Sequence, residues 1–111
     1  MLLSTKRLHR VDLVTVEGRI DASTSPELDQ CLRGLISEGR FRLVLDLTKV
    51  DYLSSAGIKS FVGVQKECKR WNRGELRLAG LQTRLKETFD MVGLTPVFKL
   101  FDTAVDAVGS F

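Results

Sequence analysis

Few residues of this sequence could carry chemistry, and they do not form a catalytic set. The chain has a single histidine, His9, so a triad of serine, histidine and aspartate is not expected. The sequence contains no glycine-rich phosphate loop, no G-x-S-x-G elbow and no H-E-x-x-H zinc pattern. Asp21, Asp46 and Asp51 could bring carboxylates together at strand ends, but nothing else completes an active site. We therefore expect no enzymatic activity, no cofactor and no metal site.

Two adjacent serines, Ser54 and Ser55, are the remaining candidates, and Ala56 and Gly57 follow them. They stand between an apolar run and a helical pattern, which predicts a helix N-terminus. One interpretation is a helix cap, worth about 1 kcal/mol. The other is a phosphorylation site, because free N–H groups and the helix dipole favour a phosphate there. The residue types alone do not choose between these interpretations.

Alternating strand and helix patterns must position these serines. Ser25 is predicted to cap a first helix that has Pro26 at its first position, and Asp102 is predicted to cap the last helix. The inward helical residues are expected to be Leu28, Cys31, Leu32, Leu35 and Ile36, then Ile58, Phe61, Val62, Gln65 and Cys68, then Leu81, Leu85, Phe89 and Val92, then Ala104, Val105 and Val108. The strands are expected at residues 2–8, 11–16, 41–47, 75–79 and 96–101.

Two strands followed by alternating helices and strands predict an α/β fold of order ββαβαβαβα. We expect a mixed, mainly parallel β-sheet with helices packed on it, because strands that alternate with helices favour that arrangement. The near-continuous apolar run from Phe41 to Leu47 is typical of a central strand covered on both faces. Glycines mark the expected breaks, with Gly18 ending the second strand and Asn72–Gly74 ending the second helix.

The composition fits a single domain over residues 1–111. With 43% hydrophobic and 28% charged residues, the chain is typical of a globular cytoplasmic protein. No stretch approaches the roughly 18 apolar residues of a membrane span, so membrane insertion is not expected. A net charge of +3 does not indicate nucleic-acid binding. Cys31 and Cys68 are expected to be buried, reduced thiols.

The stretch from Leu45 to Ile58 resembles the signature of the STAS domain, in particular of the stand-alone bacterial anti-sigma factor antagonists. Three further segments resemble other parts of the same family. They are Gly18–Leu28, Gly80–Leu94 and Val97–Ala104, and they occur in the family's order. The resemblance covers nearly the whole chain and implies the same order of strands and helices as the pattern analysis.

The resemblance implies a switch operated by phosphorylation. Such antagonists bind an anti-sigma factor that is also a serine kinase, which releases the sigma factor; phosphorylation of the antagonist ends the binding, and a phosphatase restores it. By motif position the acceptor is Ser55. Ser54, which stands where many members have an aspartate, is the runner-up. Asp21 matches an acidic position near the same loop.

The expected partner surface combines the serine loop with the connection that follows the second strand. Its residues would be Asp21, Ser23, Thr24, Ser54, Ser55, Ala56, Gly57, Ile58 and Lys59, with Ser60 exposed beside them. An alternative is a STAS module of another signalling assembly, or a soluble subunit of a membrane transport complex. A small-ligand or nucleotide-binding domain is a third possibility, although it lacks a glycine-rich phosphate loop.

Overall fold

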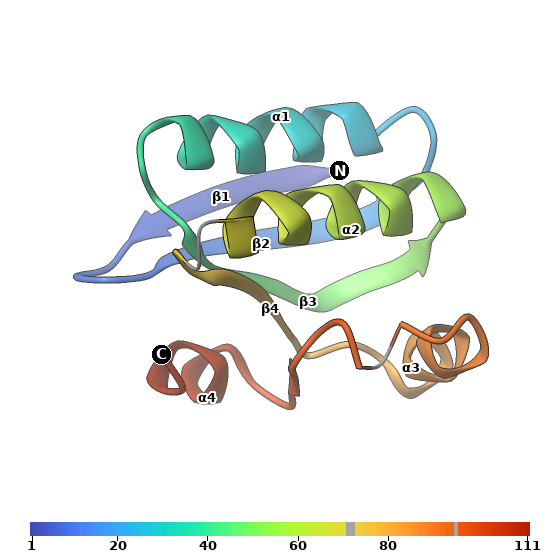
Figure 1. Ribbon diagram of the computed structural model, residues 1–111. Helices are drawn as coiled ribbons and strands as arrows, with labels where there is room; N and C mark the ends of the chain where they lie inside the picture. The colour runs from blue at the N-terminus through green and yellow to red at the C-terminus, as the bar shows by residue number, and fades with distance from the viewer. Residues whose placement is uncertain (71–72, 95) are drawn as a thin grey trace.

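The computed structural model describes residues 1–70, 73–94 and 96–111. In this part of the chain the order of elements is ββαβαβαβα, as predicted (Figure 1). The strands are β1 (Leu2–Arg7), β2 (Asp12–Ile20), β3 (Arg42–Leu53), β4 (Glu75–Ala79) and β5 (Leu100–Phe101). The helices are α1 (Ser25–Ser37), α2 (Ser55–Lys69), α3 (Thr83–Met91) and α4 (Ala104–Gly109).

The strands form a mixed, mainly parallel sheet in the order β1-β2-β3-β4-β5. β1 and β2 are an antiparallel hairpin with exposed His9 in its turn, and all the later pairs are parallel. The sheet therefore has two distinct ends. β2, β3 and β4 all begin at one end and finish at the other, so the segments that follow them gather at one edge.

The central strand β3 is longer than the sequence analysis predicted. It continues through the polar residues after Leu47 to Leu53, because Val50 and Leu53 are buried and the strand keeps pairing with β2. β2 also continues to Ile20, past the break predicted at Gly18, which adopts a positive φ of 105°. Two register shifts between these strands accommodate the irregular pairing.

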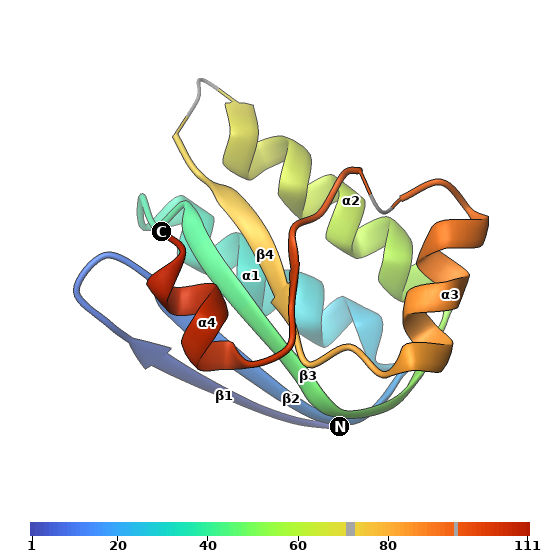
Figure 2. The same cartoon turned by 90° about the horizontal axis from the view of Figure 1, so that it is seen from below.

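Helices cover both faces of the sheet. Figure 1 shows α1 and α2 together on one side and α4 on the other. On the first side the largest fully buried side chains include Phe61, Leu28 and Leu45. α3 lies near the start of α2 in Figure 2, and its Leu85 and Phe89 belong to the same hydrophobic cluster. Each fully buried aliphatic or aromatic side chain contributes about 1.5–3 kcal/mol to stability.

Neither the serine cap predicted for α1 nor the aspartate cap predicted for α4 forms, and α1 begins one residue before, and α4 one residue after, the predicted position. Thr24, not Ser25, precedes α1, and Ser25 is buried as the first residue of that helix. Thr103, not Asp102, caps α4, because its hydroxyl accepts a hydrogen bond of 3.1 Å from the amide of Asp106. At α4 the capping hydroxyl thus belongs to the threonine beside the predicted residue, whereas the hydroxyl of Thr24 makes no capping bond in α1.

Several smaller predictions were also wrong. Val92 and Val105, predicted to face inward, are 57% and 81% exposed, because α3 ends at Met91 and α4 is short. β5 spans only Leu100–Phe101, and Cys31 is half-buried, whereas Cys68 is buried as predicted. α2 ends at Lys69, before the stop predicted at Asn72–Gly74. Asn72 lies outside the described residues.

Candidate functional site

The two serines at the start of α2 have different environments. Ser54 is the N-cap residue, and its Oγ accepts a hydrogen bond of 3.2 Å from the amide of Gly57. Its backbone is extended, with φ −84° and ψ 167°, as a cap residue requires. Ser55 is the first helical residue, is exposed, and has no side-chain hydrogen-bond partner within the described ranges. Ser54 therefore makes the helix cap that was one interpretation of this serine pair, and the hydroxyl of Ser55 remains accessible.

The residues after the serines keep this turn close to the core. Gly57 is buried, and a Cβ at this position would lie 2.6 Å from Ile20 Cγ2 and 2.7 Å from Leu53 Cδ1. Ala56 and Ile58 are half-buried, and Ile58 packs against the main hydrophobic cluster. Lys59 is exposed. A side chain at Gly57 would force Ile20 and Leu53 to shift, so α2 begins directly against the ends of β2 and β3.

The first turn of α2 carries no acidic residue. The free N–H groups of this turn and the positive end of the helix dipole therefore have no carboxylate of their own helix to balance them. In the last turn Lys66 and Lys69 match the negative end of the dipole. The start of α2 is thus an electrostatically favourable place for an added negative charge.

Asp21 organises the connection between β2 and α1. Its Oδ1 accepts hydrogen bonds from the amide of Ser23 at 3.0 Å, the hydroxyl of Ser23 at 2.7 Å and the amide of Thr24 at 3.1 Å. The hydroxyl of Thr24 donates to the carbonyl oxygen of Arg19 at 2.8 Å. The hydrogen bond from the Ser23 hydroxyl is the largest influence on the pKa of Asp21. Together with the bonds from Thr24, it lowers that pKa below 3.8 despite the opposing effect of burial.

The structure brings the two predicted segments to the same end of the sheet. The amide of Ser54 donates a hydrogen bond of 2.8 Å to the carbonyl oxygen of Ile20, the residue before Asp21. Figure 1 shows the loop into α1 and the start of α2 at the right-hand end of the sheet. Asp21, Ser23, Thr24 and Ser54 to Lys59 therefore occupy neighbouring loops and turns, as expected.

Three contacts near this site were not predicted from the sequence. Ser60, expected to be exposed, is half-buried, and its hydroxyl donates to Asp29 Oδ1 at 2.7 Å, which joins α2 to α1. Arg19 lies 4.1 Å above the ring of Tyr52. Arg84 of α3 donates to the carbonyl oxygen of Asp51. Each pair joins residues far apart in the chain, so no local pattern could have indicated it.

The remaining reactive groups of the described residues do not form a second chemical centre. No cluster of three or more histidine, cysteine, aspartate or glutamate side chains there could hold a metal ion. Asp46 is bonded to Thr48, whose hydroxyl donates to its Oδ1 at 2.6 Å. Burial raises the pKa of the Cys68 thiol to about 12, so this cysteine is a poor nucleophile at neutral pH. None of the helices within the described ranges has the length and apolar content needed to traverse a bilayer.

Comparisons with known proteins agree with this architecture. The sequence model of the STAS domain matches residues 3–107. The anti-sigma-B factor antagonist of Listeria monocytogenes is 34% identical over 87 residues, which are 78% of this chain and 75% of the relative. The protein of the same name from Staphylococcus epidermidis is 35% identical over 81 residues, 73% of this chain and 74% of the relative.

A solved structure shows the same fold over almost the whole chain. The crystal structure of an anti-sigma factor antagonist from Mycobacterium paratuberculosis has a TM-score of 0.88 and 25% identity to this protein. The similarity covers 98% of this chain and 92% of the other. With the family match over residues 3–107, these findings establish that the chain belongs to the STAS domain family.

Proposed function

We propose that this protein is an anti-sigma factor antagonist of the cytoplasm, controlled by phosphorylation of Ser55. It binds an anti-sigma factor that is also a serine kinase, and so releases a sigma factor. The relatives at 34% and 35% identity carry the name anti-sigma-B factor antagonist. The observation that carries the proposal is the exposed, unbonded hydroxyl of Ser55 beside the capping hydroxyl of Ser54.

The choice of Ser55 over Ser54 follows from these environments. Phosphorylation of Ser54 would remove the cap and place a dianion in a half-buried turn. A phosphate on Ser55 would stay in solvent, next to the N–H groups of the first turn of α2. The fold therefore tolerates a charge of about −2 at Ser55, and that charge acts on the bound partner instead.

The proposed partner surface includes both loops at this end of the sheet. Asp21, Ser23 and Thr24 contribute the β2–α1 connection, and the segment from Ser54 to Lys59 contributes the start of α2. Because Asp21 holds its own loop through three hydrogen-bond donors, this surface is formed before the partner binds. A phosphate on Ser55 adds negative charge to it and weakens binding, and a phosphatase that removes the phosphate restores the binding state.

The test is phosphorylation by the cognate anti-sigma factor kinase, with the site mapped by mass spectrometry. We expect phosphate on Ser55 in the native protein and in Ser54→Ala, but not in Ser55→Ala. In a binding titration Ser55→Ala should keep its affinity for the kinase, whereas Ser55→Asp should lose affinity. Phosphate on neither serine, or equal affinities of the native and fully phosphorylated proteins, would overturn the proposal.

A further inference from the structure

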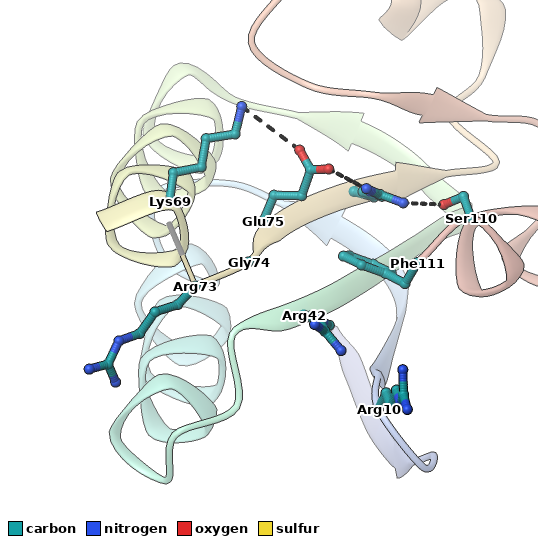
Figure 3. A pocket seen from close by; sticks show the side chains of 9 residues that line it. Arg10, Arg42, Lys69, Arg73, Gly74, Glu75, Ser110 and Phe111 are labelled. Atoms are coloured by element: carbon teal, nitrogen blue, oxygen red, sulfur yellow. Dashed lines mark hydrogen bonds and ion pairs between the residues drawn. The ribbon is translucent and has the colours of Figure 1, made fainter. Parts of the chain in front are cut away.

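A recess lined by basic side chains lies at the opposite end of the sheet from Ser55. Its volume is about 670 Å³, and its polar walls include Arg10, Arg42, Lys69, Arg73, Glu75 and Arg77 (Figure 3). We call it the arginine recess. It is built from the β1–β2 turn, the first residues of β3 and β4, and the last turn of α2. The anti-sigma function proposed above makes no use of these residues.

Two of the five cations that line the recess are partly neutralised by its carboxylate. Glu75 Oε1 accepts a hydrogen bond of 2.8 Å from Arg77 Nε, and Glu75 Oε2 lies 3.8 Å from Lys69 Nζ. Arg77 is buried, and its Nη1 donates to Ser110 Oγ at 2.6 Å. Its guanidinium also lies 3.9 Å from the centre of the Phe111 ring. Arg77, Glu75 and Lys69 thus interact with one another along one wall of the recess, and we expect this wall to be rigid.

The other three cations have no acidic partner in the described part of the chain. Arg10, Arg42 and Arg73 are exposed, and none forms an ion pair with any of the described residues. All three also line a second recess, of about 290 Å³, so the two recesses share these arginines. The guanidinium of Arg73 lies 5.3 Å from the centre of the Phe41 ring. Three unpaired guanidinium groups from separate segments thus share one concave surface.

We propose that the arginine recess binds a small anion that carries phosphate groups. Guanidinium groups match phosphate oxygens in paired hydrogen bonds, and they are less strongly hydrated than ammonium groups. A phosphate presents oxygens in several directions, so it can engage arginines from different segments at once, whereas a planar carboxylate presents two. A recess of this volume falls within the range of small-molecule sites, about 300–1,000 Å³.

The direct test is calorimetric titration of the protein with inorganic pyrophosphate, compared with citrate at equal ionic strength. Pyrophosphate should bind saturably at one site, and more tightly than citrate. Backbone amides of residues 10, 42 and 73–77 should shift in NMR spectra, and those of Ser54 and Ser55 should not. The double variant Arg10→Gln/Arg42→Gln should weaken binding by about tenfold or more, because each guanidinium supplies charge-assisted hydrogen bonds.

The matched control is Lys49→Gln/Lys86→Gln, which removes the same charge from two lysines outside the recess and outside the proposed partner surface. It should bind pyrophosphate within about twofold of the native protein, since screened charges far from the site contribute little. Equal losses of pyrophosphate affinity in both double variants would show that binding depends on overall charge and would overturn the proposal. So would the absence of saturable binding, or tighter binding of citrate or of a duplex oligonucleotide. Phosphorylation of Ser55 is measured separately and does not affect this result.

Discussion

The amide of Ser54 donates a hydrogen bond of 2.8 Å to the carbonyl oxygen of Ile20. This bond joins the end of β2 to the residue that caps α2. It therefore fixes the Asp21 loop relative to the exposed hydroxyl of Ser55, although the two segments are more than thirty positions apart in the chain.

Removal of the Ser54 hydroxyl should weaken α2 without removing the proposed acceptor. In Ser54→Ala the amide of Gly57 loses its capping partner, so the free energy of unfolding should fall by about 1 kcal/mol. Ser55→Ala should change it by less than about 0.5 kcal/mol, because that side chain is exposed and unbonded. Urea unfolding of the two variants gives the comparison. A larger loss for Ser55→Ala than for Ser54→Ala would contradict this assignment of the cap.

A methyl group at Gly57 should disturb the junction. In Gly57→Ala the new Cβ meets Ile20 Cγ2 at 2.6 Å and Leu53 Cδ1 at 2.7 Å, both on side chains that are almost or fully buried. Overpacking of this kind costs about 1–3 kcal/mol, which exceeds the gain in helix propensity. Thermal unfolding should show a lower midpoint for this variant.

Gly34→Ala is the matched control for that substitution. Gly34 lies in α1, is exposed, and has no heavy atom within 4 Å of an added Cβ. The same chemical change should therefore stabilise the protein by about 0.5–1 kcal/mol, through helix propensity alone. Equal shifts in the two midpoints would show that the contact between Gly57 and Ile20 does not restrict the turn.

The pH dependence of the Asp21 loop follows from the direction of its pKa shift. Because the folded state lowers the pKa of Asp21 below 3.8, the stabilising hydrogen bonds are present above that value. They are lost as the pH falls through the lower, folded-state pKa. In Ser23→Ala the pKa of Asp21 should rise towards its usual value, since the Ser23 hydroxyl is the largest cause of the shift. Carboxyl NMR titration measures this, and an unchanged pKa in the variant would refute the assignment.

At the opposite end of the sheet, Asp12 and Arg40 form an ion pair that holds the β1–β2 hairpin. The Asp12 side chain is 0% exposed, and Arg40 Nε donates to its Oδ2 at 2.6 Å. Arg40 Nη2 also donates to the carbonyl oxygen of Leu8 at 3.0 Å. Of the ion pairs that the described residues make with Asp12, Arg40→Gln leaves the weaker contact to Arg7, at 3.6 Å. The free energy of unfolding of this variant should be lower than that of the native protein by at least about 2 kcal/mol.

A double-mutant cycle separates this pair from other effects of the substitutions. Asp12→Asn/Arg40→Gln should be less destabilised than the sum of the two single variants, because it leaves no buried charge without its partner. Denaturant unfolding of all four proteins gives the coupling energy. Additive losses would mean that the two side chains stabilise the hairpin independently.

The local sequence was sufficient for the order of elements and for the position of the serine loop. The apolar run before Leu47 and the helical spacing from Ile58 to Cys68 both report burial, and burial follows a regular period in strands and helices. That one of the two serines caps α2 could also be predicted, because a cap depends on a residue and its neighbours three positions along. The cap at Thr103 was missed by one residue, since adjacent polar side chains compete for the same role, and α1 begins after Thr24 without a side-chain cap.

Tertiary structure alone decided the features that depend on distant segments. β3 extends to Leu53 because β2 offers backbone partners along its whole length, which no property of the polar residues after Leu47 indicates. The Asp29–Ser60 bond and the arginine recess likewise join residues from separate elements. The sequence by itself determined where two serines stand at the start of a helix. Only the packing of that helix against Ile20 and Leu53 decided which hydroxyl is bonded within the turn and which one faces solvent.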